Sequence, residues 1–473
     1  MASTHASSEG SHWDARLWTA LVVLCGVVFL DGLDVSMVGV ALPSIRSDLG
    51  LSTSQLQWVV SGYVLGYGGL LLLGGRVADL LGRRRALLGA LGVFTVASVL
   101  GGLTSDPTLL VATRFIKGAA AAFTAPASLS IITTTFPEGP ARNKALSVYT
   151  ACGASGFSSG LILGGLLTEI GWRWTFLLPV PIALVILVIA PRVLARDLQL
   201  GRVRGRFDVL GALTVTAGML LLVRTVVQAP AEGWGSAMTL GSFVLATALL
   251  ALFVTIEQRT SHPLVRLGIL RSGSLARANL AGGAMFGCYI GFQFVATLFL
   301  QNELGWSAIH TALAFLPAGL LVAFGAPRIG ALADRFGTER LVALGFVSFV
   351  VGYALFLRVG DTLSYPAVML PTMLLLGIGF ALTFPSLNIQ ATAGVADHEQ
   401  GLASGLVNTS FQVGGAIVLA VVSAVVSSRG AGTTFLDAMR PALGVVIGVA
   451  VIGLVISVSG LVRGREAVAP AVT

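Results

Sequence analysis

Two pairs of charged side chains fall inside otherwise apolar stretches of this 473-residue chain. Asp31 and Asp34 are three residues apart in the first stretch, and Arg114 and Lys117 are three apart in the fourth. Residues with this spacing share one face of a helix, so each pair points in one direction. A carboxylate near a basic group can gain and lose a proton as its surroundings change. The chemistry that these residues could perform is therefore proton transfer.

The elements that must position these charges are membrane-spanning helices. The chain is 55% hydrophobic and 11% charged, whereas soluble proteins carry about 25% charged residues. Its apolar runs are long and lack the alternation of barrel strands, so they predict helices. A charge in the bilayer core costs at least about 2.5–3.5 kcal/mol, so charges retained there are expected to be functional.

We expect fourteen spans of about 20 residues each, arranged as six, two and six. The expected ranges are 17–42, 55–75, 86–105, 107–135, 142–168 and 172–190, then 208–228 and 236–257, then 278–300, 308–327, 341–358, 366–390, 401–428 and 438–462. The expected parts are a cytoplasmic tail (1–16), a six-helix bundle (17–190), linkers with two inserted helices (191–277), a second six-helix bundle (278–462) and a cytoplasmic tail (463–473). The chain is thus predicted to be an all-α integral membrane protein.

The distribution of basic residues predicts the topology. Most of the 29 Lys and Arg residues fall in alternate loops, on the side where both termini would lie. Cytoplasmic loops are enriched in these residues, so both termini are expected inside the cell. This placement argues against nucleic-acid binding, which would gather basic residues on one domain. Lysine is scarce beside arginine, which indicates a GC-rich bacterial genome. We therefore expect the protein to lie in the inner membrane of a bacterium.

A loop motif occurs twice, at residues 75–85 and 330–340. Each copy has a glycine, an aspartate four residues later and a second glycine three residues after that, between the second and third helix of a six-helix group. The chain is therefore a duplicated six-helix unit with two helices inserted between the copies.

Residues 75–85 resemble the signature loop of the major facilitator superfamily, and fourteen spans resemble its fourteen-helix drug:proton antiporter branch. Residues 33–43 resemble that branch's Leu-Asp-x-Thr-x-Val-Asn-Val-Ala-Leu-Pro, and residues 114–118 resemble Arg-x-x-Gln-Gly with Lys117 in place of Gln. Residues 156–165 resemble Gly-x-x-x-Gly-Pro-x-x-Gly-Gly with Leu161 in place of Pro. Residues 172–176 resemble the turn that opens helix six, although Pro179 follows where Asn is usual. The resemblance implies the major facilitator fold and a proton-coupled transporter.

The depths of the four charges predict how they pair. Asp34 lies about 13 Å and Arg114 about 10 Å from the outer ends of their helices, at 1.5 Å per residue. Asp31 and Lys117 lie one turn deeper and form a second possible pair. We expect Asp34 to carry the transported proton and Arg114 to stabilise its carboxylate. For both pairs, a static salt bridge that only fixes helix packing is the alternative.

The repeated loop is predicted to be a conformational latch. Asp79 can accept hydrogen bonds from the amino terminus of a neighbouring helix, and the arginines after it can pair with acids across the interface between the halves. The resemblance implies the same role, while a purely topogenic basic loop is the alternative. The predicted latch residues are Gly75, Asp79, Gly82, Arg83, Arg84, Asp334 and Arg335.

Two further sets of residues are expected to act in transport. Gly156, Gly160, Gly164 and Gly165 recur at helical spacing on the fifth helix, and the resemblance implies that this face packs against the other half. Ordinary helix packing is the alternative. The substrate pocket is expected between the halves, and its candidate residues are Tyr63, Tyr67, Phe292, Gln293, Asn388, Asn408 and Gln412. Such polar residues can instead simply join helices.

Competing classes of function lack their usual motifs. No Gly-x-x-x-x-Gly-Lys-[Ser/Thr] sequence occurs, so an ion gradient is the expected energy source in place of ATP. The five histidines lie in tails or at helix ends without metal-ligand spacing, so we expect neither an enzyme nor a metal site. A sensor or scaffold that transports nothing remains open.

We predict a proton-coupled exporter of lipophilic, multiple drugs. The alternative is dedicated export of a single endogenous metabolite or antibiotic. The expected partners are lipophilic small molecules and the lipid bilayer, with no nucleic acid and no ATP. The expected state is a monomer with no cofactor, and protons are the coupling ion.

Overall fold

The computed structural model describes residues 13–51, 53–195, 208–260, 272–360, 363–396, 399–427 and 435–466. Within these residues the regular structure is entirely helical, and fourteen helical stretches are long and apolar enough to cross a membrane. The predicted all-α fold with fourteen spans is therefore confirmed. Most of both expected tails, and parts of the linkers around the insert, lie outside the described residues.

The helices follow the expected order of six, two and six. The first six spans are α1 (Ala15–Leu49), α2 (Thr53–Leu81), α3 (Arg83–Leu103), α4 (Pro107–Thr135), α5 (Pro140–Ile170), and α6 (Arg173–Leu177) with α7 (Pro179–Val193). The insert is α8 (Val209–Glu232) and α9 (Ala237–Arg259). The last six are α10 (Gly273–Leu298) with η2 (Phe299–Glu303), α11 (Ala308–Phe336), α12 (Thr338–Phe356), η3 (Tyr365–Met369) with α13 (Leu370–Thr392), α14 (Gln400–Ser427) and α15 (Phe435–Glu466).

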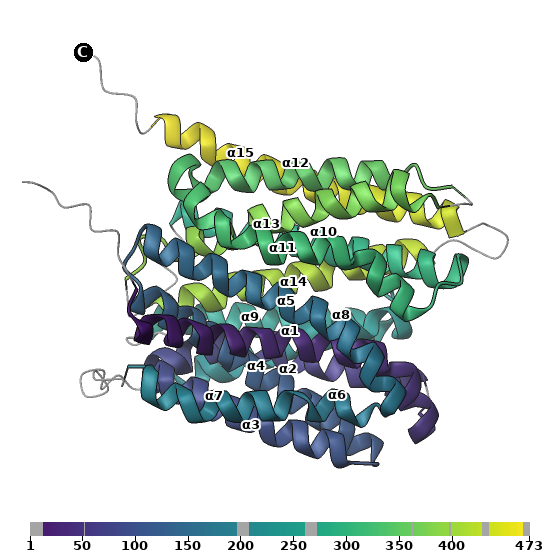
Figure 1. Ribbon diagram of the computed structural model, residues 1–473, viewed down its shortest axis with the longest axis horizontal. Helices are drawn as coiled ribbons and strands as arrows, with labels where there is room; N and C mark the ends of the chain where they lie inside the picture. The colour runs from purple at the N-terminus through teal and green to yellow at the C-terminus, as the bar shows by residue number, and fades with distance from the viewer. Residues whose placement is uncertain are drawn as a thin grey trace, which may run out of the picture.

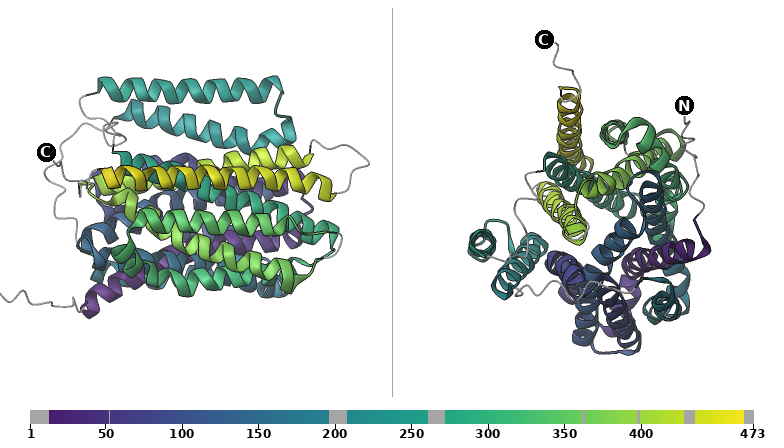
Figure 2. Two further views of the ribbon diagram at one scale, coloured as in Figure 1. Left: turned by 90° about the horizontal axis from the view of Figure 1, so that it is seen from above. Right: turned by 90° about the vertical axis from the view of Figure 1, so that its left-hand side faces the viewer.

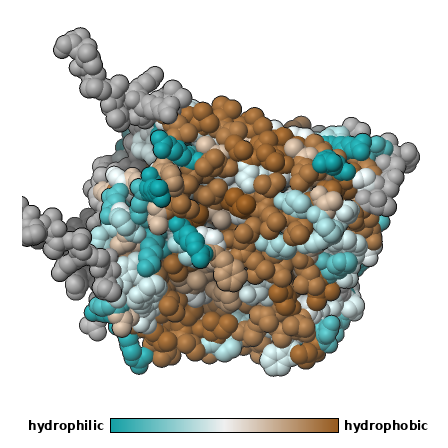
Figure 3. Space-filling model, turned by 45° about the horizontal axis from the view of Figure 1, so that its top comes forward, coloured by the Kyte–Doolittle hydropathy of each residue, from teal (hydrophilic) through white to brown (hydrophobic). Residues whose placement is uncertain are grey.

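The helices run alongside one another from one end of the molecule to the other (Figure 1). The start of α1 and the end of α15 lie at the same end, on the left of Figure 1, which we call the terminus face. The opposite end is the far face. Apolar side chains cover much of the surface between the two faces (Figure 3), as expected for a protein surrounded by lipid.

The repeated motif is more helical than the apolar pattern suggested. The second span does not end at residue 75 but continues to Leu81, and α11 continues to Phe336, so both motif aspartates lie in the last turns of helices. In each copy, only the second glycine interrupts the helical structure, between the end of one helix and the start of the next. Gly82 and Gly337 have φ values of 101° and 81°, a conformation that favours glycine.

Glycines hold α5 against α1 within the N-terminal bundle. A Cβ atom on Gly156 would lie 2.2 Å from the Phe29 carbonyl oxygen, and one on Gly160 would lie 2.6 Å from that of Leu33. Gly164 likewise meets the backbone of Met37 at 2.8 Å. The expectation that this face packs against the other half is therefore wrong for these three glycines. They bring α1, which carries both aspartates, close to α5.

The fourth glycine of the motif faces the other half. A Cβ atom on Gly165 would lie 3.2 Å from the side chain of Ile309 on α11. The two helices remain close along their length, since an added Cβ atom on Gly319 would overlap the Ser158 side chain and one on Gly330 would lie 2.7 Å from the Asn143 backbone. The α5–α11 contact is thus one of the main joints between the bundles.

The two-helix insert lies at the edge of the molecule, where α8 packs against α2 and α14 and α9 packs on α8 (Figure 2). The contact with α2 is close, because a Cβ atom on Gly69 would lie 2.3 Å from the Leu220 side chain. Ala212, Val215 and Met219 share an apolar cluster with Leu402 of α14. The insert therefore covers the line along which α2 and α14 meet.

Candidate functional site

Asp34 forms the centre of a buried ion-pair cluster between α1 and α4. The Arg114 Nη1 atom donates to Asp34 Oδ2 at 2.5 Å, and the Lys117 ammonium group donates to Asp34 Oδ1. Asp34 and Lys117 are fully buried, and Arg114 is 2% exposed. The predicted contact between Asp34 and Arg114 is confirmed as a contact, while its role in coupling stays a prediction.

The second predicted pair does not form. Lys117 joins Arg114 on Asp34, and Asp31 accepts a hydrogen bond from the Thr124 hydroxyl at 3.3 Å. The helix geometry explains this arrangement: Arg114 and Lys117 lie on one face of α4, so both can reach a single carboxylate between them. The prediction of two separate acid–base pairs is wrong.

The register of α4 is set by its start. Asp106 accepts hydrogen bonds from the amides of Thr108 and Leu109, and Pro107 occupies the first position of the helix. Both features are typical of a helix amino terminus. The two basic residues consequently lie two to three turns inside the span.

Apolar and aromatic groups surround the two cations. The Arg114 guanidinium lies 4.7 Å from the ring centre of Tyr63 and donates through Nε to the Val59 carbonyl at 3.0 Å. The Lys117 ammonium lies 4.7 Å from the Phe94 ring and 5.1 Å from the Phe176 ring. Rings in these positions attract cations through their negative faces.

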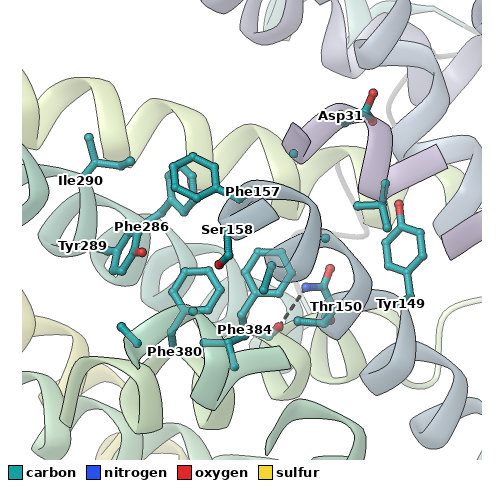
Figure 4. A pocket seen from close by; sticks show the side chains of 18 of the residues that line it. Asp31, Tyr149, Thr150, Phe157, Ser158, Phe286, Tyr289, Ile290, Phe380 and Phe384 are labelled. Atoms are coloured by element: carbon teal, nitrogen blue, oxygen red, sulfur yellow. Dashed lines mark hydrogen bonds between the residues drawn. The ribbon is translucent and has the colours of Figure 1, made fainter. Parts of the chain in front are cut away.

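A cavity of about 250 Å³ lies between the two bundles. Its walls come from α1, α2, α4 and α5 on one side and from α10, α11, α13 and α14 on the other. Figure 4 shows Asp31 and Tyr149 on one side of it and the rings of Phe286 and Tyr289 on the other. The cavity is therefore mainly apolar and aromatic, as is typical of sites that bind small organic molecules.

Four of the seven predicted pocket residues line this cavity, namely Tyr67, Gln293, Asn388 and Asn408. The other three lie elsewhere. Tyr63 packs beneath Arg114, and Phe292 is buried in the core of the C-terminal bundle, where its ring lies 5.1 Å from that of Tyr353. Gln412 lines a second cavity of about 370 Å³, between α2, α8, α10 and α14. The placement of Phe292 in the pocket is a wrong prediction, because consecutive residues of a helix point about 100° apart, so Phe292 faces the core while Gln293 faces the cavity.

Sequence reasoning missed the aromatic wall of the cavity. The rings of Phe286, Tyr289, Phe380 and Phe384 gather there, and those of Tyr289 and Phe380 are 5.0 Å apart. The available signal was the spacing of the aromatic residues along each helix, which is four from Phe380 to Phe384 and three from Phe286 to Tyr289. In a helix that is apolar on every side, this spacing does not reveal which face meets the cavity.

The first latch residue spans the two bundles at the terminus face. Asp79 Oδ2 accepts a hydrogen bond from the backbone amide of Leu402 at 3.2 Å, in the first turn of α14. The first amides of a helix have no partner within it and favour negative charge. Gly75 lies beside Gly405 of α14, where an added Cβ atom on Gly405 would be 3.7 Å from the Gly75 Cα atom. This contact is the one that the sequence predicted for Asp79.

The second copy of the motif makes the matching contact. Asp334 Oδ1 accepts a hydrogen bond from the Asn143 side chain, in the first turn of α5. Nearby, Glu138 Oε1 accepts from the backbone amide of Gly394 at 3.1 Å. Together with the Asp79 contact, these hydrogen bonds join the two bundles at the terminus face.

The arginines of the motif make local contacts. Arg83 donates to Asp79 at 3.4 Å, and Arg84 donates to the Pro191 carbonyl at 2.7 Å within the same bundle. Arg335 lies over the ring of Phe336, at 5.1 Å from its centre. For Arg84, the expected pairing across the interface is therefore wrong, since its hydrogen bond fixes α3 to α7.

A polar cluster at the far face fixes the N-terminal bundle. Asp48 Oδ2 accepts from the Trp172 indole nitrogen at 2.9 Å and from Arg173 Nη1 at 2.7 Å. Arg173 also donates to Ser105 at 3.1 Å. The indole hydrogen bond, with the Arg173 hydrogen bond and charge, lowers the pKa of Asp48 from its ordinary value.

Comparison with known proteins agrees with this architecture. A family model described as Major Facilitator Superfamily matches residues 24–419. The chain is 39% identical to the puromycin resistance protein of Streptomyces alboniger, covering 89% of this chain and 84% of that protein. It is 40% identical to the cephamycin export protein of Amycolatopsis lactamdurans, covering 88% of this chain and 86% of that protein. The crystal structure of a human organic anion transporter is similar in fold alone, with a TM-score of 0.68 at 16% identity, covering 94% of this chain and 100% of that one.

Proposed function

The chain belongs to the major facilitator superfamily, and on that premise we propose that it is a proton-driven exporter of lipophilic compounds. The observation that carries the proposal is the buried Asp34 between Arg114 and Lys117, one helical turn from a cavity lined by Asp31. The family and the relatives indicate a transporter rather than an enzyme.

Asp34 is the proposed carrier of the proton. In the described arrangement it is sealed from solvent and its charge is balanced by two cations. Breaking a buried ion pair leaves an uncompensated charge, so a proton on Asp34 and release of its basic partners are expected to occur together. This couples protonation to the relative position of α1 and α4.

The motif aspartates are the proposed latch for one of the two end states. Asp79 and Asp334 each hold the start of a helix in the opposite bundle, so both contacts must break before the terminus face can open. The partly buried Asp79 hydrogen bond is expected to contribute about 1.5–3 kcal/mol and the exposed Asp334 hydrogen bond about 0–1 kcal/mol, so together they bias the closed state. Opening and closing around the central cavity then provide alternating access.

We place the protein in a bacterial inner membrane with both termini in the cytoplasm, so that the terminus face is the cytoplasmic one. The basic loops and the two bacterial relatives support this location. The proposed partners are the bilayer and small lipophilic molecules, and protons supply the energy without ATP, nucleic acid or cofactor. The proposed unit is a monomer.

Two ranges of substrate are open to such an exporter. The apolar, aromatic cavity favours several lipophilic compounds over one, because few polar groups restrict what it binds. The names of the relatives, which specify puromycin resistance and cephamycin export, favour the alternative of dedicated export of a single metabolite or antibiotic.

Growth and transport assays test both points. The gene is expressed in a bacterial host from which other pumps have been deleted, and inhibitory concentrations are measured for unrelated dyes and antibiotics. Higher values for several unrelated compounds support multidrug export, and a rise for one compound alone supports the dedicated alternative. Purified protein in liposomes must then accumulate the same compound when a pH gradient is imposed. If an imposed gradient drives no transport of any protected compound, proton-driven export is wrong.

A further inference from the structure

The second cavity, of about 370 Å³, has no part in the mechanism proposed above. Its walls come from α2 of the N-terminal bundle, from α10 and α14 of the C-terminal bundle and from α8 of the insert. It extends along α14 from Gln412, in the middle of that helix, to Ser423, near its end. Because α14 starts at the terminus face, the second cavity lies in the half of the molecule toward the far face.

The second cavity borders the central cavity. The side chains of Phe286 and Ile290, one helical turn apart on α10, line both spaces. Each space also has a wall of its own, since α13 lines the central cavity and α8 lines the second one. The two cavities are therefore neighbours with different surroundings.

The insert supplies part of the wall through one face of α8. Leu220, Val223 and Val226 are three residues apart along this helix, so they share a face. Val223 packs against Gly68 of α2, where an added Cβ atom would lie 3.3 Å from its side chain. Val226 follows on the same face, is 6% exposed and lines the second cavity. The insert is therefore part of this cavity, in addition to covering the line along which α2 and α14 meet.

The described residues that line the second cavity are all uncharged. Their polar groups are the hydroxyls of Ser61 and Ser423 and the amide of Gln412, and the rings of Phe286 and Phe294 add apolar surface. A charged ligand would meet no opposite charge among these residues, and burying an unpaired charge is costly. An uncharged molecule with an apolar body and a hydrogen-bonding group avoids this cost. The volume of about 370 Å³ lies within the usual range for small-molecule sites, about 300–1,000 Å³.

We propose that the second cavity is a binding site for uncharged, lipophilic molecules that carry a hydrogen-bonding group, and that the two-helix insert forms this site together with α2, α10 and α14. The inference goes beyond the proposed function, because it assigns a ligand class to a separate site and a binding role to the insert. The hydroxyls and the amide hold the polar group of the ligand, and the aromatic and aliphatic side chains hold its apolar body.

Photolabelling of the protein in liposomes tests the inference without a pH gradient. The probe is azioctanol, an uncharged alcohol with a photoreactive diazirine group, and labelled positions are identified by mass spectrometry of peptides. We expect labelling of α14 between Gln412 and Ser423, and excess octanol should displace it, because a defined site is saturable. Azioctanol that is only dissolved in the bilayer labels lipid-facing positions, and octanol does not displace that labelling.

Filling the second cavity from either side should remove the displaceable labelling. Ala416→Phe adds a ring from α14, and Val226→Phe adds one from the insert. Each should lower the labelling about tenfold or more, as for loss of at least about 1.4 kcal/mol of binding. The matched controls are Ile417→Phe on α14 and Leu213→Phe on α8, whose side chains are 49% and 61% exposed. They should label within about twofold of the original protein, because exposed positions tolerate substitution.

Two filling variants keep the test decisive if one of them does not fold. The inference is overturned if octanol displaces no labelling of α14, which is also the result if a bilayer lipid occupies the second cavity permanently. It is overturned if a folded filling variant labels as the original protein does, or if the controls lose labelling equally. Equal loss of labelling from α13, which lines the central cavity, would show that the site is not separate. Because no gradient is applied, these outcomes are independent of whether protons drive export.

Discussion

The N-terminal bundle buries Asp34, Arg114 and Lys117 at its centre, whereas the C-terminal bundle is filled with aromatic rings. Among the described residues of α10 to α15, the buried polar side chains are all uncharged. In the core of that bundle, the rings of Phe349 and Tyr353 stack 5.8 Å apart. The two bundles therefore differ most in their buried charged side chains, which are the groups that a proton-transfer mechanism would use.

Glycine packing is shared by the two bundles. In the N-terminal bundle, α5 meets α1 through Gly156 and Gly160. In the C-terminal bundle, α14 meets α10 through Gly414, where an added Cβ atom would lie 2.2 Å from the Gly283 carbonyl oxygen. The duplicated unit thus keeps its helix packing while its interior chemistry differs. The proposed proton coupling therefore belongs to the N-terminal bundle, while the C-terminal bundle supplies much of the aromatic cavity wall.

The largest expected effect comes from breaking the shared packing. Gly156→Leu and Gly414→Leu should both abolish folding, because each side chain would overlap backbone atoms that cannot move independently. Size-exclusion chromatography of fluorescently tagged protein measures this. Gly448→Leu is the control, since a Cβ atom there meets nothing within 4 Å. A folded protein from only one of the two variants would show that the bundles do not share this packing.

The next effect concerns the two copies of the latch. Asp79→Asn should lower the transport rate about tenfold, because a charged hydrogen bond to a helix amide contributes about 1.5–3 kcal/mol. Asp334→Asn should have an effect of about twofold or less, since Asp334 is exposed, and exposed charge contacts contribute about 0–1 kcal/mol. Initial rates in liposomes at equal protein content measure both. Equal effects would contradict this difference between the bundles.

The smallest effect concerns the far face of the N-terminal bundle. The Trp172 and Arg173 hydrogen bonds lower the pKa of Asp48. The ionised Asp48 therefore stabilises the folded state above the unfolded pKa of about 3.9, and this contribution is lost as the pH falls through the folded value. Asp48→Asn should melt slightly below the original protein at pH 7, and the difference should vanish in acid. A difference in melting temperature that grows as the pH falls would contradict a stabilising role for the ionised Asp48.

Much of this arrangement could be predicted from the sequence, because charges in apolar stretches are few. The depths of Asp34 and Arg114 predicted their contact, and the duplicated motif predicted that Asp79 would hold a neighbouring helix. These predictions needed only helix geometry and the unpaired amides at helix ends.

The features that were predicted wrongly depend on the rotation of each helix about its own axis, which decides the neighbour that each face meets. Lys117 lies on the same face as Arg114 and reaches Asp34 rather than Asp31. Gly156 contacts α1 and not the other bundle, and Phe292 lies in the core beside Gln293, which lines the cavity. A helix surrounded by lipid and by other helices is apolar on all sides, so hydrophobic periodicity does not reveal its rotation.

The most direct test of proton coupling in the N-terminal bundle is transport by Asp34→Asn in liposomes. The variant keeps the shape of the side chain but cannot carry the proton. We predict that an imposed pH gradient no longer drives accumulation of the exported compound, while exchange of labelled for unlabelled compound continues. Accumulation driven by the gradient at the original rate would show that Asp34 is not the carrier.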